Sequence, residues 1–226
     1  LILLLTNTFN VLALKVNVPL TNDGAWSLNT QPSAVYHEGN VYFSWINKVG
    51  DLMLSSYSQS TDEVKVTTVA SGYGTEDFAS PALLVRASGQ ILIFASKNTA
   101  ESGFQCYRST SVTGDITAGF TSQTMTGYGI SATLPFALGD NIVVFWRSKN
   151  SVGYTFIAGA NSETNTAALG TGTRAGFLGT DIANNYQFRD EVPTMRAVQG
   201  VDGTIHMAIT QLGTGLKYSN STVHYI

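Results

Sequence analysis

Glycine-containing turns recur along this chain at a nearly constant interval. The first turn of each unit is centred on Gly39, Gly89, Gly139 and Gly203, at spacings of 50, 50 and 64 residues. Apolar runs flank each turn, and a second turn follows 10 to 14 residues later, with Gly50, Gly103, Gly153, and Gly213 or Gly215. Two hairpins in a unit of about 50 residues are typical of a β-propeller blade. Since one blade cannot bury both of its faces, the repeat predicts that the units stack.

The apolar runs between the turns predict the strands. In the first unit, 32–70, four strands are expected, at 33–36, 41–45, 52–57 and 64–69. The later units begin near 80, 130 and 192, with strands at 82–85, 91–94, 105–108, 132–135, 141–146, 204–209 and 221–225. No long 3.6-residue periodicity is visible, so almost no helix is expected. The fold class is therefore all-β, a propeller of four-stranded antiparallel blades with four blades visible; a two-sheet sandwich is the alternative.

Two regions are expected along the chain, an N-terminal segment 1–22 and a propeller domain 23–226. The run Leu1–Leu5 lacks the initiator Met and charged flank of a signal peptide, and it is far shorter than the ~20 residues that span a bilayer. A strand or an assembly contact is expected there, and the alternating run Val11–Val18 reads as a strand that closes the ring. Both ends are expected to be cut from a longer chain.

Composition and charge exclude several classes of function. The formal net charge is −3, and no basic stripe is present, so nucleic-acid binding is not expected. The single cysteine, Cys106, lies in a predicted strand and is expected to be a buried apolar filler. His37, His206 and His224 lie in three different segments without metal-ligand spacing, so neither a metal nor a cofactor is predicted.

Paired carboxylates precede the start of two units. Glu76-Asp77 comes before Pro81, and Asp190-Glu191 comes before Pro193, which places both pairs on loops between blades. Such pairs either serve glycoside hydrolysis or are solvated loop charges. The run Gly170–Thr173 lacks a lysine and a strand–helix setting, which argues against phosphate binding.

Eight short segments, taken in order and spacing, carry a family resemblance: Asp23–Ser27, Ala34–Gly39, Gly50–Leu52, Ser55–Tyr57, Glu76–Ala82, Tyr107–Ser109, Phe145–Arg147 and Asp202–His206. They resemble the BNR-repeat family of seven-bladed propellers, which includes polysaccharide lyases acting on ulvan-like, uronate-containing glycans. Related modules occur in phage tail fibres and other virion surface proteins. The Asp-box typical of sialidases is not intact, so sialidase chemistry is not expected. The resemblance implies that four visible blades are short of a ring of seven.

The chain departs from the family at its catalytic positions. Phe78 stands where the lyases have a catalytic histidine, and Lys97 replaces a second one. The expected tyrosine is Ile130 or Ser131, and the usual His-Pro-Arg is Gln211–Gly213. β-Elimination needs a base for the C5 proton and an acid for the leaving oxygen, and phenylalanine supplies neither. The substitutions therefore predict that the family's chemistry is lost.

The expected function is non-catalytic binding of an acidic polysaccharide on a virion or cell surface. Arginine suits carboxylate and sulfate groups, so Arg108, Arg147 and Lys97 are expected to converge near one end of the blades, unless they form structural ion pairs. The other expected contacts are Trp26, Glu76 and Asp77. The alternatives are an active polysaccharide lyase with altered residues and a structural virion module. The expected partners are a polysaccharide or cell-surface glycan and other virion or surface protein subunits, and an oligomer is one option. The chain is expected to have no membrane span and to be located outside the cell or on the virion surface.

Overall fold

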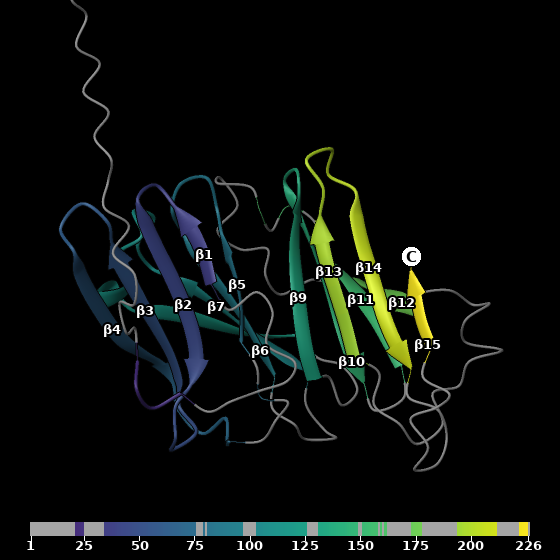
Figure 1. Ribbon diagram of the computed structural model, residues 1–226, viewed down its shortest axis with the longest axis horizontal. Coiled ribbons are helices and arrows are strands. Elements are labelled where there is room, and N and C mark those ends of the chain that lie inside the picture. Colours follow the sequence, from purple (N-terminus) through teal and green to yellow (C-terminus); the bar gives the residue numbers. More distant parts are fainter. Residues whose placement is uncertain are drawn as a thin grey trace, which may run out of the picture.

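The computed structural model describes residues 21–24, 34–75, 79, 81–96, 103–125, 131–148, 151–157, 159, 161, 173–177, 194–211 and 222–225. These residues form four antiparallel sheets and one short 3-10 helix (Figure 1). The N-terminal segment 1–22, apart from Thr21 and Asn22, lies outside the described residues, and so does the predicted strand Val11–Val18. Within the described part of the chain, no helix is long and apolar enough to cross a membrane.

Each sheet is built in chain order. The first contains β1 (Ala34–His37), β2 (Asn40–Ile46), β3 (Leu52–Ser58) and β4 (Glu63–Ala70). The second contains β5 (Ala82–Val85), β6 (Ile91–Ser96), β7 (Phe104–Ser109) and β8 (Phe120–Met125), with η1 (Ile116–Ala118) between β7 and β8. The third contains β9 (Ser131–Leu138), β10 (Asn141–Ser148), β11 (Ser151–Ile157) and β12 (Thr173–Phe177). The fourth contains β13 (Thr194–Gln199), β14 (Ile205–Gln211) and β15 (Thr222–Tyr225).

The glycine repeat sets the hairpins. The turn between the first and second strand of every sheet carries one of the four repeat glycines, and all four have positive φ, between 57° and 91°. Glycine adopts this conformation without the steric cost that a Cβ brings. The strands predicted in all four units are confirmed, with boundaries that shift by up to three residues. β8, β11, β12 and β13 are not among them, and Gly153, expected in a turn, lies in β11.

The sheets pack face to face through alternate side chains of their inner strands. Every residue of β6 is buried, as expected for a strand that is covered on both sides. Ile91, Ile93 and Ala95 pack toward the first sheet, whereas Leu92 and Phe94 pack toward the third. Successive strand residues point to opposite faces of a sheet, so one apolar run fills two interfaces. Met195 and Met207 of the fourth sheet pack against Leu134 of the third.

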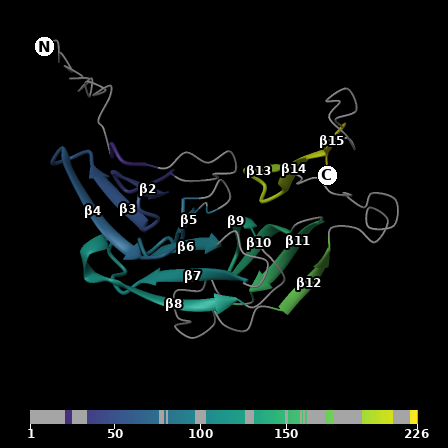
Figure 2. The ribbon, with the colours of Figure 1, turned by 90° about the horizontal axis from the view of Figure 1, so that it is seen from below.

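The four sheets are arranged around a common centre. The strand that comes first in each sheet lies at its inner edge, where β1 contacts β5 and β5 contacts β9. Figure 2 shows the sheets fanning outward, with β4, β8 and β12 at the periphery. Four separate sheets in this order match the predicted propeller blades and not a two-sheet sandwich.

Candidate functional site

The two ends of the sheets differ in the kind of connection they carry. At the end called here the turn end, the repeat glycines join the first strand of each sheet to the second. At the opposite end, called the entry end, each first strand begins and each second strand finishes. Ser96 at the end of β6 pairs there with Phe104, and Arg147 near the end of β10 pairs with Ser131. The connections between successive sheets also start and finish at the entry end, where loops are free to vary and to carry a site.

A polar residue stands at one equivalent sequence position of each repeat unit. This residue comes eight positions after the turn glycine, and it is Asn47, Lys97, Arg147 and Gln211 in the successive sheets. Arg147 lies in β10 and Gln211 ends β14, while Lys97 directly follows β6 and lies outside the described residues. Asn47 serves the fold, because its Oδ1 accepts the backbone N–H groups of Val49 and Asp51 at 3.0 and 2.8 Å.

A β-bulge distorts the backbone between the predicted positions Ser131 and Arg147. Trp146 pairs with Thr133 and Arg147 pairs with Ser131, so Ala132 is the extra residue, with φ of +50°. A non-glycine residue in this conformation is strained, and such strain gathers at functional sites. The bulge is anchored by Thr133, whose Oγ1 donates to the carbonyl of Phe94 in the second sheet at 3.0 Å. The entry end of the third sheet is therefore shaped by a contact with its neighbour.

The structure places Arg108 and Arg147 at different distances from the entry end of their sheets. Arg108 pairs with Leu92, whereas the entry end of the same sheet is marked by the pair Ser96 and Phe104. Four residues along a strand correspond to about 13 Å. The expectation that Arg108 and Arg147 converge at one end is therefore wrong, because Arg108 lies four residues inside β7 while Arg147 lies near the end of β10. Burial raises the pKa of the Cys106 thiol to about 12, and the positive charges of the buried Arg86 and the half-buried Arg108 offset only part of this rise.

The remaining predicted site residues, Trp26, Glu76, Asp77, Phe78 and Lys97, lie outside the described residues. Of the segment that begins at Asp23, the structure describes two residues. The Asp23 carboxylate accepts hydrogen bonds from Thr21 Oγ1 at 2.6 Å and from the indole Nε1 of Trp45 at 3.2 Å. These bonds, led by the one from Thr21, lower the pKa of Asp23. Sequence reasoning missed Trp45, although its position two residues before Asn47 places it at the entry end.

Two buried tyrosines beneath the entry end are structural. The hydroxyl groups of Tyr73 and Tyr107 lie 2.7 Å apart, and burial raises the pKa of both above the usual value. Both therefore stay protonated at neutral pH and do not act as bases. Over the part of the chain that the structure describes, no three His, Cys, Asp or Glu side chains gather as metal ligands.

Comparisons with known proteins identify the fold. An ulvan lyase of polysaccharide lyase family PL25, bound to -[GlcA(1-4)Rha3S]-, superposes with a TM-score of 0.58 at 15% identity, over 84% of this chain and 48% of the lyase. The GH93 α-L-arabinofuranosidase of Fusarium graminearum, in complex with arabinobiose, gives 0.56 at 10% identity, over 92% of this chain and 72% of that enzyme. The α-L-arabinofuranosidase PaAbf62A from Podospora anserina, in complex with cellotriose, gives 0.52 at 9% identity, over 90% and 64%.

The chain spans about half the length of the ulvan lyases that it matches. No family model matches the sequence, and no curated protein matches it. At identities of 9 to 15%, these structural neighbours establish the fold and no more. The chain has the β-propeller fold that carbohydrate-active enzymes share.

Proposed function

We propose that the entry end of this propeller binds an acidic polysaccharide without cleaving it. Lys97 and Arg147 supply the positive charge, and each comes eight residues after the turn glycine of its unit. The observation that carries the proposal is the bulge at Ala132, whose φ of +50° is strained and which sets the backbone of Arg147 opposite Ser131. A guanidinium group offers a planar pair of donors for a carboxylate or sulfate group, and an ammonium group adds a second charge.

The residues at the family's catalytic positions support binding over cleavage. Abstraction of the C5 proton and protonation of the leaving oxygen need groups that exchange protons within hydrogen-bond reach of the substrate. Phe78 has no such group, and Ser131 has an ordinary hydroxyl where the lyases have a tyrosine. A lysine at position 97 neutralises a uronate well but serves as a base only with a strongly lowered pKa. Trp26, Glu76 and Asp77 stay predicted contacts of the same site.

Calorimetric titration with ulvan, alginate and glucuronan tests the proposal. The variants Lys97→Gln and Arg147→Gln are expected to weaken binding about tenfold each, because each loses a charge-assisted hydrogen bond. Arg108→Gln is the matched control, since Arg108 lies four residues from the entry end of the second sheet, and this variant is expected to have little effect on binding. Absence of binding to all three glycans, or equal losses for all three variants, would contradict the proposal.

An active polysaccharide lyase is the second candidate, favoured by the superposition on PL25 ulvan lyase. In this case the protein would release unsaturated uronate products, which absorb in the ultraviolet. Incubation of the protein and of Arg147→Gln with the same three glycans separates the candidates. An increase in ultraviolet absorbance that the variant abolishes establishes the lyase. Constant absorbance together with retained glycan binding supports the non-catalytic role. An extracellular or virion-surface location, with partner subunits of a tail fibre, remains a prediction from the sequence resemblance.

A further inference from the structure

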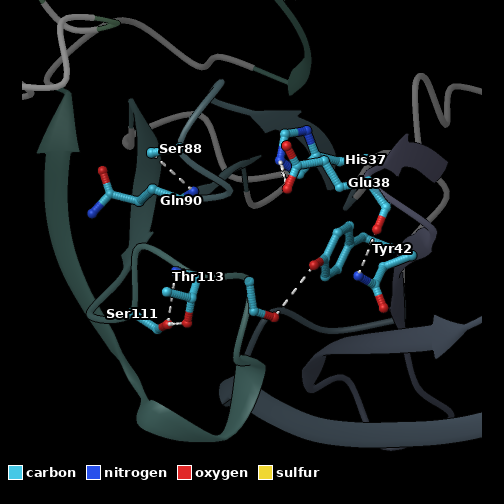
Figure 3. Close-up of polar contacts among 9 residues, drawn as sticks. His37, Glu38, Tyr42, Ser88, Gln90, Ser111 and Thr113 are labelled. Atoms are coloured by element: carbon cyan, nitrogen blue, oxygen red, sulfur yellow. Dashed lines mark hydrogen bonds and ion pairs between the residues drawn. The ribbon is translucent and has the colours of Figure 1, made fainter. Parts of the chain in front are cut away.

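A polar concavity lies far from the entry end, between the first and second sheets. It is a cleft of about 310 Å³ at the turn end, and its walls are the inward face of the first sheet and the connection between β7 and η1. Figure 3 shows the boundary between these walls, where Tyr42 donates a hydrogen bond to the carbonyl of Gly114 at 3.4 Å. The volume is at the lower end of the ~300–1,000 Å³ of small-molecule sites.

The strand register builds one wall of the cleft as two polar rows. Tyr42 pairs with Ser56, which pairs with Lys65, and two residues farther toward the turns Asn40 pairs with Ser58, which pairs with Glu63. Residues two apart on a strand lie on the same face, so all six belong to the face of the first sheet that looks toward the second. Deeper on this face the residues are apolar, with Ile46, Leu52 and Leu54 in the core. The side chains on this face therefore change from apolar in the core to polar where the cleft opens.

The opposite wall adds hydroxyl and carboxylate groups. Thr113 and Asp115 are exposed there, and Asp115 is fixed by hydrogen bonds from the N–H and hydroxyl of Thr117 at 3.0 and 2.8 Å. The backbone bond from Thr117 is the largest cause of the lowered pKa of Asp115, and the Lys65 ammonium across the cleft lowers it further. The Asp115 carboxylate is therefore ionised at neutral pH. Asp115 and Lys65 lie on opposite walls of the cleft.

We propose that this cleft is a separate binding site for a short neutral saccharide. Sugar hydroxyls both donate and accept hydrogen bonds, and the walls offer carboxylate acceptors, an ammonium donor, the Asn40 amide and the hydroxyls of Ser56, Ser58, Thr61 and Thr113. Glu63 and Asp115 outnumber Lys65, so the net charge of the lining is negative. Like charges repel in such a confined space, which disfavours uronate and sulfated sugars. The cleft thus differs in ligand class from the cationic entry end.

Backbone NMR shift mapping and calorimetry on the full chain test the proposal. The neutral probes are maltotriose, xylotriose and chitotriose, and trigalacturonic acid is the anionic comparator. At least one neutral probe is expected to shift the amide signals of Lys65, Thr113 and Gly114, while the acidic trimer leaves them in place. Asp115→Asn keeps a side chain that caps η1 and is expected to weaken binding about tenfold, as is Glu63→Gln. Ser56→Phe fills the cleft from the middle of its row and is expected to abolish binding.

Asp140→Asn is the matched control, since Asp140 lies in the β9–β10 turn of the third sheet. Thermal melts confirm that each variant folds, and Glu63→Gln on an exposed strand position keeps the test valid if Ser56→Phe does not fold. Absence of binding by all neutral probes, binding unchanged in Glu63→Gln and Asp115→Asn, or preference of the cleft for the acidic trimer would each overturn the proposal. The entry-end proposal stands or falls separately, because it is read out with acidic polysaccharides and with Lys97 and Arg147.

Discussion

The hydroxyl groups of Tyr73 and Tyr107 meet at 2.7 Å in the buried interface between the first and second sheets. Tyr73 belongs to the connection between these sheets and Tyr107 to β7, so the bond ties a loop to the neighbouring blade. Their rings contact edge to face, with centroids 6.3 Å apart. Tyr107→Phe is expected to lower the free energy of unfolding by about 1 kcal/mol, measured by urea denaturation. A double-mutant cycle with Tyr73→Phe should give a coupling energy near 1 kcal/mol, and strictly additive losses would contradict the bond.

Thr133 is expected to be a stabilising contact between the second and third sheets. Thr133→Val keeps the shape of the side chain but removes the hydrogen bond from Oγ1 to the buried carbonyl of Phe94. Loss of the bond is expected to cost about 1–2 kcal/mol in urea denaturation. Thr124→Val is the control, since the Thr124 hydroxyl bonds Gln105 at an exposed position and should cost less than about 0.5 kcal/mol. An equal loss in the free energy of unfolding for both variants would show that the hydrogen bond between the sheets adds nothing to stability.

Gly50 is expected to tolerate no side chain. Its φ is +89°, and a Cβ would lie 2.8 Å from the backbone nitrogen of Gly74, which no rotation of a side chain relieves. The carbonyl of Gly50 also accepts the N–H of Tyr73 at 2.7 Å. Gly50→Ala should destabilise the fold by about 3 kcal/mol. Gly39→Ala has a similar φ but open space around its Cβ, so calorimetric melting should show a loss of only about 1 kcal/mol.

Asp202 is expected to contribute to the loss of folding stability at low pH. Its carboxylate accepts the backbone N–H and the hydroxyl of Thr204, each at 3.0 Å, and these bonds lower its pKa below 3.8. When the pKa of a carboxyl is lower in the folded protein than in the unfolded chain, the ionised carboxylate stabilises the fold at pH values above the unfolded-state pKa. This stabilisation is lost as the pH falls through the folded-state pKa. Asp202→Asn should therefore flatten the decline of stability between about pH 4 and pH 2, measured by urea denaturation. An equal slope in Asp202→Asn and in the unchanged protein would refute the linkage.

The positions of the candidate sites were only partly predictable. The glycine spacing predicts that Arg147 lies near one end of its sheet, because strand length and register are local properties, and the pairing of Arg147 with Ser131 agrees. Arg108 also follows apolar residues, yet it lies about four residues from that end, and only the pairing of β7 with β6 reveals this. The cleft at the turn end had no sequence signal, since Lys65 and Asp115 are 50 residues apart and meet through the packing of two sheets.

The sequence by itself determined most of the strands, the first turn of each sheet and the order of the sheets, because alternation and glycine turns act over neighbouring residues. It also determined that Cys106 is buried, since an apolar strand covered on both faces leaves no exposed position. Only the tertiary structure decided which faces meet. The bond from Thr133 to Phe94, the contact of Trp45 with Asp23 and the polar cleft beside Tyr42 all join residues more than 20 positions apart. Such contacts depend on how whole sheets stack, which no local pattern encodes.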